Sequence, residues 1–234
     1  MARVAVSVVV PVYNQKDKLE GCVLAIQRSL GDANIKDYEI IIAEDGSKDG
    51  SYEEALRIWR KYPFVKVSHV NRKSGRGNAV CRGFTEATGE IVAYIDADQA
   101  TETSHLAALI DAARKTGIAT GSRYLRSSAA SRRVRRLFFS QVFNWLVRVI
   151  LNSKVSDHQC GFKAFRKGVA KDLCVRTKEK HWLWDTEVLV LAQRQGLVVS
   201  EIPVVWREQA NTTMRLKNDI WDMFWGIIRL RQRL

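Results

Sequence analysis

The amino-acid sequence predicts a single α/β domain with a mainly parallel sheet flanked by helices, followed by a C-terminal amphipathic helix. The 234 residues are 46% hydrophobic and 27% charged, which suits one globular core and excludes a disordered chain. Short β-branched runs alternate with helical patterns through the first half of the chain. This order is typical of parallel βαβ units with right-handed crossovers.

The elements follow one another in a regular order. Buried strands are expected at Val4–Val10, Tyr38–Glu44, Val65–Val70 and Ile91–Asp96. Helices are expected at Lys16–Leu30, Tyr52–Tyr62, Gly77–Thr88 and His105–Lys115, and one more short strand at Ile118–Gly121. In such sheets ligands bind beyond the carboxyl ends of the strands, so the residues directly after each strand are the candidates for a site.

The chain carries a formal net charge of +13, and the excess is concentrated in one stretch. Residues 112–156 hold ten basic side chains and no acidic one. A basic balance of this size indicates a polyanionic partner, which is a nucleic acid, an anionic lipid surface or a phosphate-bearing substrate.

Cysteine usage and hydropathy indicate a cytoplasmic protein. No stretch reaches the ~18–20 consecutive apolar residues of a membrane span, and no signal-peptide pattern precedes the first strand. The cysteines form no CxxC pair and have no zinc spacing, so we expect reduced core thiols at Cys22, Cys81, Cys160 and Cys174.

The first two expected strands end in polar turns. Asn14 can cap the helix that follows the first strand, and Ser51 with Glu54 has the spacing of a capping box after the second. Asp45, at the end of the second strand, is not required by turn chemistry, and its carboxylate could accept hydrogen bonds from a nucleobase. Ser47 lies in the same turn.

The third and fourth strands end in a glycine-rich loop and in a pair of carboxylates. Gly75 and Gly77 flank Arg76 at a helix start, which suits either the approach of an anionic ligand or a tight connection to the helix. Extended backbone places Asp96 and Asp98 on the same side of the chain. Two carboxylates at a sheet edge suit Mg²⁺ or Mn²⁺, with phosphate oxygens completing the coordination shell.

Together the four segments resemble the family 2 glycosyltransferases, which have Pro-x-Tyr-Asn, Asp-Gly-Ser, a glycine-rich helix start and Asp-x-Asp in this order. The resemblance covers the first ~120 residues, a domain's worth, and implies the glycosyltransferase A type of fold and a nucleotide-sugar donor. It implies that Asp45 contacts the base and that Asp96 and Asp98 lie at the metal. The family usually has Glu in place of Gln15. The implied nucleotide-sugar-binding residues are Pro11, Tyr13, Asn14, Gln15, Asp45, Ser47, Arg76 and Asp96.

The second half resembles the polyprenyl-phosphate branch of this family, the dolichyl-phosphate glucosyltransferases and mannose synthases. The segments that carry the resemblance are 121–123, an arginine-rich helix, 156–163, 184–187 and 201–204. The string from Gln159 to Lys163 is closest to the glucosyl type, which implies a UDP-sugar donor, glucose, rather than GDP-mannose. In the mannose type a Gln two places after the second Asp helps to hold the metal. Here that place is Ala100 and the Gln is Gln99, which becomes the candidate third metal ligand.

A phosphate acceptor changes the catalytic demand. A sugar hydroxyl needs a general base, whereas a phosphate monoester, with a second pKa of ~6, is already a nucleophilic dianion at neutral pH. Attack opposite the leaving group inverts the anomeric centre. The resemblance implies phosphate-binding positions at Arg123, Arg136 and Ser140. Arg215, which matches a basic residue in the family's C-terminal motif, and Arg207, by its chain position alone, are further candidates for binding the acceptor phosphate. The candidate catalytic residues are Asp98, Arg123, Asp185 and Glu187, of which the last two could orient the acceptor or the sugar.

Two segments, 132–151 and 220–234, combine Trp, Phe and Arg at helical spacing, which suits a lipid interface. The alternatives are a core or dimer helix for the first and a helix docked on the domain for the second. The first carries one polar stripe on an otherwise apolar helix, formed by Arg133, Arg136, Ser140, Asn144 and Arg148. We therefore expect a catalytic domain over residues 1–217 and a membrane-interface helix over 218–234. The protein is then peripheral on the cytoplasmic face of the membrane, with no transmembrane helix.

Other functions fit parts of the sequence. The same fold can transfer a sugar to a sugar hydroxyl, with Asp185 as the base and no need for a lipid helix. A nucleic-acid-binding protein fits the charge, but no zinc finger, RNP motif or recognition helix is present, and the carboxylates Asp45, Asp96 and Asp98 would repel a phosphate backbone. A nucleotidyltransferase fits the carboxylate pair and leaves the lipid-like helices unexplained.

Overall fold

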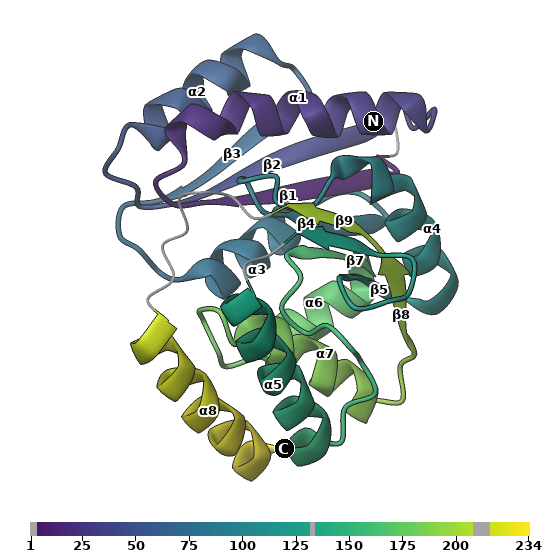
Figure 1. The fold of residues 1–234 in the computed structure, drawn as a ribbon. Coiled ribbons are helices and arrows are strands. Elements are labelled where there is room, and N and C mark those ends of the chain that lie inside the picture. The colour runs from purple at the N-terminus through teal and green to yellow at the C-terminus, as the bar shows by residue number, and fades with distance from the viewer. Residues whose placement is uncertain (1–3, 132–133, 208–215) are drawn as a thin grey trace.

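The computed structural model describes residues 4–131, 134–207 and 216–234, and within them the chain forms a three-layer α/β structure (Figure 1). The central layer is a seven-stranded sheet in the order β3-β2-β1-β4-β7-β5-β8. Its strands are β1 (Val6–Val12), β2 (Tyr38–Asp45), β3 (Val65–Val70), β4 (Ile91–Ile95), β5 (Ile118–Ser122), β7 (Phe162–Arg166) and β8 (Val199–Pro203). A separate parallel pair joins β6 (Ala129–Ser131) to β9 (Val205–Arg207).

Helices cover both faces of this sheet. One face carries α1 (Lys16–Asp32), α2 (Ser51–Lys61) and α4 (Leu106–Thr116), and the other carries α3 (Arg76–Glu86), α6 (Lys167–Arg176) and α7 (Trp184–Arg194). A short 3-10 helix, Thr103–His105, precedes α4. Beyond the second layer of helices lie α5 (Val134–Leu151) and α8 (Leu216–Arg233), side by side at the bottom of Figure 1. The predicted α/β class, the mainly parallel sheet and the terminal helix are confirmed.

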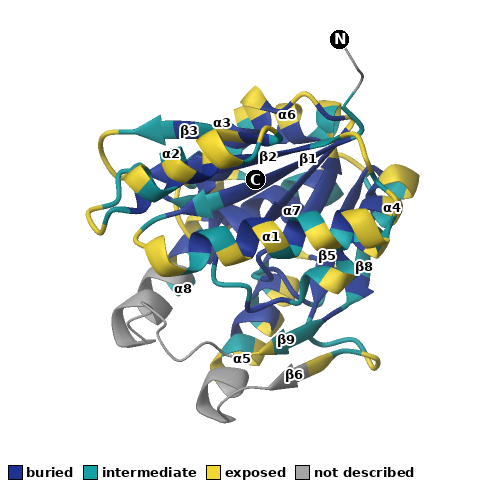
Figure 2. Cartoon of the chain, turned by 90° about the horizontal axis from the view of Figure 1, so that it is seen from above, coloured by how far each residue is buried: buried dark blue, intermediate teal, exposed yellow. Residues whose placement is uncertain are grey.

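Side chains that alternate along each strand form the two hydrophobic cores, one on each face of the sheet. In β1 the side chains of Val8 and Val10 lie in the buried cluster that contains Leu19 of α1, whereas Val9 lies in the cluster that contains Phe84 of α3. Successive side chains of a strand point to opposite faces, so an unbroken apolar run is what a sheet covered on both sides requires. Figure 2 shows the central strands in the buried colour, and the edge strand β3 mostly in the intermediate colour, between helices whose exposed residues lie on their outer faces.

The direction of β7 determines which loops meet. All neighbouring pairs in the sheet are parallel except β4–β7 and β5–β7, which are antiparallel. The start of β7 therefore lies at the same edge as the ends of β1, β2, β4 and β5. Residues 156–161, which precede β7, are brought to this carboxyl edge, and the expected pattern of strands did not include this reversed strand.

The expectation that all cysteines are reduced is wrong for one pair. Cys81 of α3 and Cys174 of α6 form a disulfide with a Cα–Cα distance of 5.5 Å, and Cys22 and Cys160 are free and buried. The two helices pack against each other, which brings together cysteines 93 positions apart in the sequence. Chain spacing alone cannot reveal such a pair.

The C-terminal helix docks on the domain at its far end. Ile227 and Leu230 of α8 are fully buried in a small cluster with Val147 of α5 and with Leu183 and Val190. Across the described ranges of the chain, no helix has the length and apolar content needed to cross a bilayer.

Candidate active site at the carboxyl edge of the sheet

The turns that follow β1 and β2 are tied to each other. The backbone N–H of Asn14 donates to Ser47 Oγ, and the N–H of Lys48 donates to Asn14 Oδ1, both at 2.9 Å. The N–H of Gln15 donates to Ser51 Oγ at 2.9 Å. The polar residues predicted at these two strand ends thus form one connected surface.

The helix caps expected at Asn14 and at Ser51 with Glu54 do not form, because the Asn14 and Ser51 side chains make the contacts between the two turns instead. The N-caps of α1 and α2 are Gln15 and Gly50, and neither makes a side-chain capping hydrogen bond. Asn14 has a left-handed φ of 55°, and Ser51 lies inside α2 rather than before it, so the capping box with Glu54 does not form. Bonds between the two turns satisfy these side chains instead.

Asp45 lies buried at the end of β2 and holds the loop after β3. Its Oδ1 accepts the N–H of Ser74 at 2.8 Å and the Ser74 hydroxyl at 2.5 Å, and its Oδ2 accepts the N–H of Gly75 at 2.9 Å. In the same loop the Lys73 ammonium lies 3.9 Å from the centre of the Tyr13 ring. Tyr13, Asp45 and the glycine-rich loop are therefore neighbours, as binding of one nucleotide requires.

The glycine-rich start of α3 is covered by protein. The N–H groups of Gly77 and Asn78 donate to the carbonyl of Lys180, at 2.8 and 3.3 Å. A Cβ added at Gly75 would lie 2.4 Å from the same carbonyl, and one at Gly77 would lie 2.6 Å from the Trp184 side chain. These glycines thus allow the close approach of another segment, which supports the tight-connection interpretation rather than anion binding at this helix start.

Asp96 and Asp98 follow β4 and have different surroundings. Asp96 Oδ1 accepts Nε and Nη2 of Arg76 at 3.0 and 2.7 Å. Its Oδ2 fills the space beside Gly161, where a Cβ would come within 1.8 Å of it. Asp98 Oδ1 accepts only the N–H of Ala100, at 3.0 Å, within the described part of the chain. Burial and the charge of Asp96 raise the pKa of Asp98.

This donor set fits a hard divalent cation that shares its coordination shell with a substrate. Two carboxylates are present, and the described residues hold no cluster of three or more His, Cys, Asp or Glu that could bind a metal without further ligands. A cation would also relieve the crowded negative charge of Asp96 and Asp98. Gln99, the predicted third ligand, has a φ of 55°, and its Nε2 lies 3.5 Å from where a Cβ on Gly21 of α1 would stand.

Behind Asp96 a chain of alternating charges runs into the protein. Arg76 Nη1 donates to Asp185 Oδ2 at 2.5 Å, and Asp185 Oδ1 accepts Lys163 Nζ at 2.7 Å and the Tyr94 hydroxyl. Asp185 is 1% exposed and Lys163 is fully buried. Burial raises the pKa of Asp185 to about 6 against the opposing effect of Arg76, and burial lowers the pKa of Lys163 to about 7.

Lys163 also fixes the loop before β7. Its Nζ donates to the carbonyls of Cys160 at 2.6 Å and His158 at 3.1 Å. The Lys of the Gln-Cys-Gly-Phe-Lys string thus points into the domain and joins this loop to α7.

Arg123 follows β5 and is bound by a carboxylate. Its Nε and Nη2 donate to the two oxygens of buried Asp157, at 2.6 and 2.7 Å, and its backbone N–H donates to Asp157 Oδ2 at 3.0 Å. Burial alone would lower the pKa of Arg123, but Asp157 outweighs it and raises it. The Trp206 ring lies 5.6 Å from the guanidinium carbon. Arg123 is thus a fixed cation at the edge, already balanced by one anion.

The other predicted site residues are more scattered. Glu187 Oε2 accepts the N–H groups of Lys178 and Glu179, at 2.9 and 2.7 Å, rather than facing the Asp96–Asp98 pair. Arg207 is 73% exposed and pairs with Glu102 at 2.9 Å, and Ser140 accepts the Tyr124 hydroxyl at 2.5 Å. Pro11 lies within β1, paired with Ala43 of β2. The side chain of Arg136 and all of Arg215 lie outside the described residues.

Sequence reasoning missed three residues of this edge. Asp157 and Tyr94 act through side-chain contacts with partners 34 and 91 positions away, and Cys160 acts through its backbone carbonyl. The one available signal was the placement of Asp157 and Cys160 in the segment before β7, which chain order alone does not bring to the site.

Comparison with known proteins gives relatives whose names agree with one another. The model of the family described as "Glycosyl transferase family 2" matches residues 7–174. The glycosyltransferase AglD of Haloferax volcanii is 39% identical over 231 residues, which cover 97% of this chain and 37% of that protein. The dolichyl-phosphate beta-glucosyltransferase of Drosophila melanogaster is 34% identical over 218 residues, which cover 86% of this chain and 67% of that protein. The chain thus spans little more than a third of the first relative and about two thirds of the second.

Solved structures share the fold at low sequence identity. Glucosyl-3-phosphoglycerate synthase from Mycobacterium tuberculosis, in complex with UDP, matches with a TM-score of 0.72 at 18% identity, over 99% of this chain and 81% of that one. The mannosyltransferase PcManGT from Pyrobaculum calidifontis, in complex with GDP-Man and Mn²⁺, matches with a TM-score of 0.64 at 18% identity, over 98% of this chain and 65% of that one. At this identity the likeness establishes the fold alone.

Proposed function

The chain belongs to glycosyl transferase family 2, and we propose that it transfers glucose from a nucleotide sugar to a polyprenyl (dolichyl) phosphate with inversion at the anomeric carbon. The observation that carries this proposal is identity of 30–39% to AglD and to dolichyl-phosphate beta-glucosyltransferases over most of this chain. The carboxyl edge of the sheet, with Asp45 at one side and the Asp96–Asp98 pair at the other, supplies the residues that such a donor needs.

The donor is held by the turns after β1, β2 and β4. Asp45 and Tyr13 bind the nucleoside, and Asp96 and Asp98 are the residues that would hold a divalent cation. When bound, Mg²⁺ or Mn²⁺ supplies positive charge that stabilises the departing nucleoside diphosphate. Related folds have been solved with UDP and with GDP-Man, each with Mn²⁺. The names of the relatives and the Gln159–Lys163 string favour UDP-glucose over GDP-mannose.

The surroundings of Asp185 favour a phosphate acceptor over a sugar hydroxyl. Both of its oxygens are engaged, by Arg76 on one side and by Lys163 and Tyr94 on the other, and it is 1% exposed. A general base must reach the proton that it removes. A phosphate dianion needs no base, so Asp185 serves to position Arg76, and transfer to a hydroxyl is the disfavoured second function.

The acceptor phosphate is bound by basic residues at the other side of the edge. Asp157 engages Nε and Nη2 of Arg123, and Nη1 has no hydrogen bond within the described residues, so it remains for a phosphate oxygen. The family resemblance adds Arg136, Ser140 and Arg215 to this proposed acceptor site, and chain position adds Arg207, although the side chain of Arg136 and all of Arg215 lie outside the described residues. Charge-assisted bonds from several donors offset the repulsion between the acceptor phosphate and the donor diphosphate.

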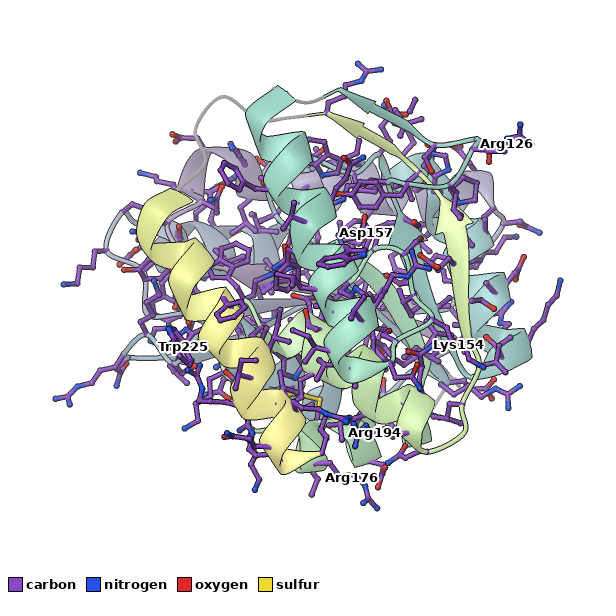
Figure 3. The ribbon with its side chains drawn as sticks, turned by 60° about the horizontal axis from the view of Figure 1, so that its bottom comes forward. Arg126, Lys154, Asp157, Arg176, Arg194 and Trp225 are labelled. Atoms are coloured by element: carbon purple, nitrogen blue, oxygen red, sulfur yellow. A yellow bond between two sulfur atoms is a disulfide. The ribbon has the colours of Figure 1, made fainter. Side chains whose placement is uncertain are left out.

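The outer face of α5 supports attachment to a membrane surface. Phe139, Val142, Trp145 and Val149 recur at helical spacing and are 37–61% exposed. Asn144, in the expected polar stripe, instead points inward, where its Oδ1 accepts the N–H of His158 at 2.9 Å. Trp225 of the neighbouring α8, labelled in Figure 3, is 55% exposed. We assign this face to the cytoplasmic surface of a membrane, where the polyprenyl chain of the acceptor lies.

Incubation with labelled donors tests the proposal directly. The protein is given UDP-glucose, UDP-N-acetylglucosamine or GDP-mannose with polyprenyl phosphate and Mg²⁺ or Mn²⁺, and label in the organic phase is counted. We expect label from UDP-glucose that depends on the polyprenyl phosphate and on the metal. Label from GDP-mannose alone would overturn the glucosyl assignment, and transfer only to water-soluble sugars would overturn the acceptor assignment.

A further inference from the structure

The segment 177–183, between α6 and α7, lies directly on the start of α3. The carbonyl of Lys180 accepts the N–H groups of Gly77 and Asn78, and the Lys180–His181 backbone and ring leave no room for a Cβ at Gly75. The Trp182 ring stacks 4.9 Å from the guanidinium carbon of Arg76. The segment has no regular helix or strand of its own, so its position depends on contacts with its neighbours.

The start of α3 joins the two carboxylates assigned to the donor. Gly75 donates its N–H to Asp45 Oδ2 at 2.9 Å, and Arg76 donates to Asp96 Oδ1 at 2.7 and 3.0 Å. A shift of this backbone by a fraction of an ångström moves both contacts together. Whatever holds segment 177–183 in place therefore also holds the donor side of the edge.

The C-terminal helix holds this segment from the other side. Arg233 of α8 pairs with Glu179 Oε1 at 2.5 Å and lies 3.8 Å from Glu187 Oε1. Glu187 in turn accepts the N–H groups of Lys178 and Glu179 through its Oε2. Leu183, at the end of the segment, packs in the cluster that contains Ile227 and Leu230 of α8.

We propose that Arg233 is a positioning residue for the donor site, which acts through Glu179 and Glu187 to keep segment 177–183 on the start of α3. The ion pair is partly screened, with side-chain exposures of 31% for Arg233 and 18% for Glu179. Its loss should therefore weaken the segment's attachment by a modest factor rather than unfold the domain. Donor binding then depends on the same helix that lies beside the exposed face of α5.

Hydrogen–deuterium exchange on the full chain tests this coupling. Arg233→Gln should speed exchange in peptides covering residues 75–79 and 177–183 and weaken UDP binding by roughly two- to fivefold in calorimetry. Arg231→Gln is the matched control, because it removes the same charge from the same helix end and Arg231 has no ion pair among the described residues. Arg233→Lys should restore part of the UDP affinity. Equal exchange and equal UDP affinity in Arg233→Gln and Arg231→Gln would overturn the proposal.

A second variant covers the case in which Arg233→Gln fails to fold. Glu179→Gln leaves α8 and Glu187 unchanged and removes only the partner carboxylate, so the proposal requires faster exchange at residues 75–79 in this variant too. The UDP-binding readout rests on the proposed function, whereas exchange does not. If the wild type binds no UDP and exchange at 75–79 is still faster in the variants, the donor assignment is refuted and the coupling remains. Unchanged exchange in Glu179→Gln would refute the coupling itself.

Discussion

Replacing Asp185 by Asn tests whether this carboxylate is an anchor, which holds Arg76 and Lys163 in place, or a general base. In the wild type this carboxylate binds Arg76 Nη1 at 2.5 Å and Lys163 Nζ at 2.7 Å, and it also accepts the Tyr94 hydroxyl. An amide cannot neutralise either cation. If Asp185 is an anchor, the variant leaves two buried cations short of an anion and loses the orientation of Arg76.

The size of the effect follows from this burial. Removing one partner of a buried ion pair costs about 3–5 kcal/mol. A chain of this length loses about 2–4 °C in melting temperature per kcal/mol, so we expect a decrease of roughly 6–20 °C. Burial already lowers the pKa of Lys163 to about 7, so its ammonium can lose a proton in the variant, which favours the lower half of that range. Arg76 cannot relieve its charge in this way.

Thermal unfolding of three proteins provides the assay. Asp185→Asn should melt well below the wild type, and the double variant Asp185→Asn/Lys163→Met should recover part of the loss because it removes the uncompensated ammonium. UDP affinity should fall in the single variant, since Arg76 no longer holds Asp96 in place. A melting temperature within ~2 °C of the wild type, with normal UDP binding and lost turnover, would refute the anchor and restore the general base.

Three further outcomes are expected. Asp98→Asn should abolish Mg²⁺- or Mn²⁺-dependent turnover with an unchanged melting temperature, and full wild-type activity in excess chelator would contradict this. Burial lowers the pKa of His158 from 6.5 to about 3, so the unfolded chain takes up a proton below pH 6.5 that the folded one does not. Its contribution to the free energy of unfolding should fall by roughly 2 kcal/mol from pH 7 to pH 5. His158→Gln should reduce that slope, and an equal slope would contradict it. Trp145→Gln with Trp225→Gln should reduce co-flotation with anionic liposomes while Trp59→Gln, an exposed control on α2, should not. Equal flotation of the wild type, the double variant and the Trp59→Gln control would exclude the α5–α8 face as the membrane-binding surface.

Most of the fold could be predicted because the pattern of apolar and polar residues within a short stretch of chain determines whether that stretch forms a helix or a strand. The apolar run before Asp96 and the alternation of strands with amphipathic helices can be read within windows of ten residues, and the structure has those elements within a few residues of their expected bounds. The candidate site was predictable for the same reason. Parallel strands deliver their following residues to one edge, so Asn14, Asp45 and Asp98 needed no knowledge of contacts.

The remainder depends on contacts between distant parts of the chain. Arg76 meets Asp185 across 109 positions, and Cys81 meets Cys174 across 93. Neither pair has a spacing that marks it. The glycines at the start of α3 show the limit of local reasoning, because ligand approach and backbone packing demand the same residue, and only the position of Lys180 decides between them.

The charges at this edge explain why the chain needs a separate basic stretch. A row of ion-paired side chains alternates in charge, in the order Asp96, Arg76, Asp185 and Lys163. Arg123 is paired with Asp157. Among the described residues near β4, Asp98 is the carboxylate without an ion pair, so the donor side carries surplus negative charge that suits a cation. A balanced edge has little positive charge to offer a second phosphate. The proposed acceptor site therefore needs cations outside these pairs, and the basic residues of 112–156 other than Arg114 and Arg123 are the candidates to supply them.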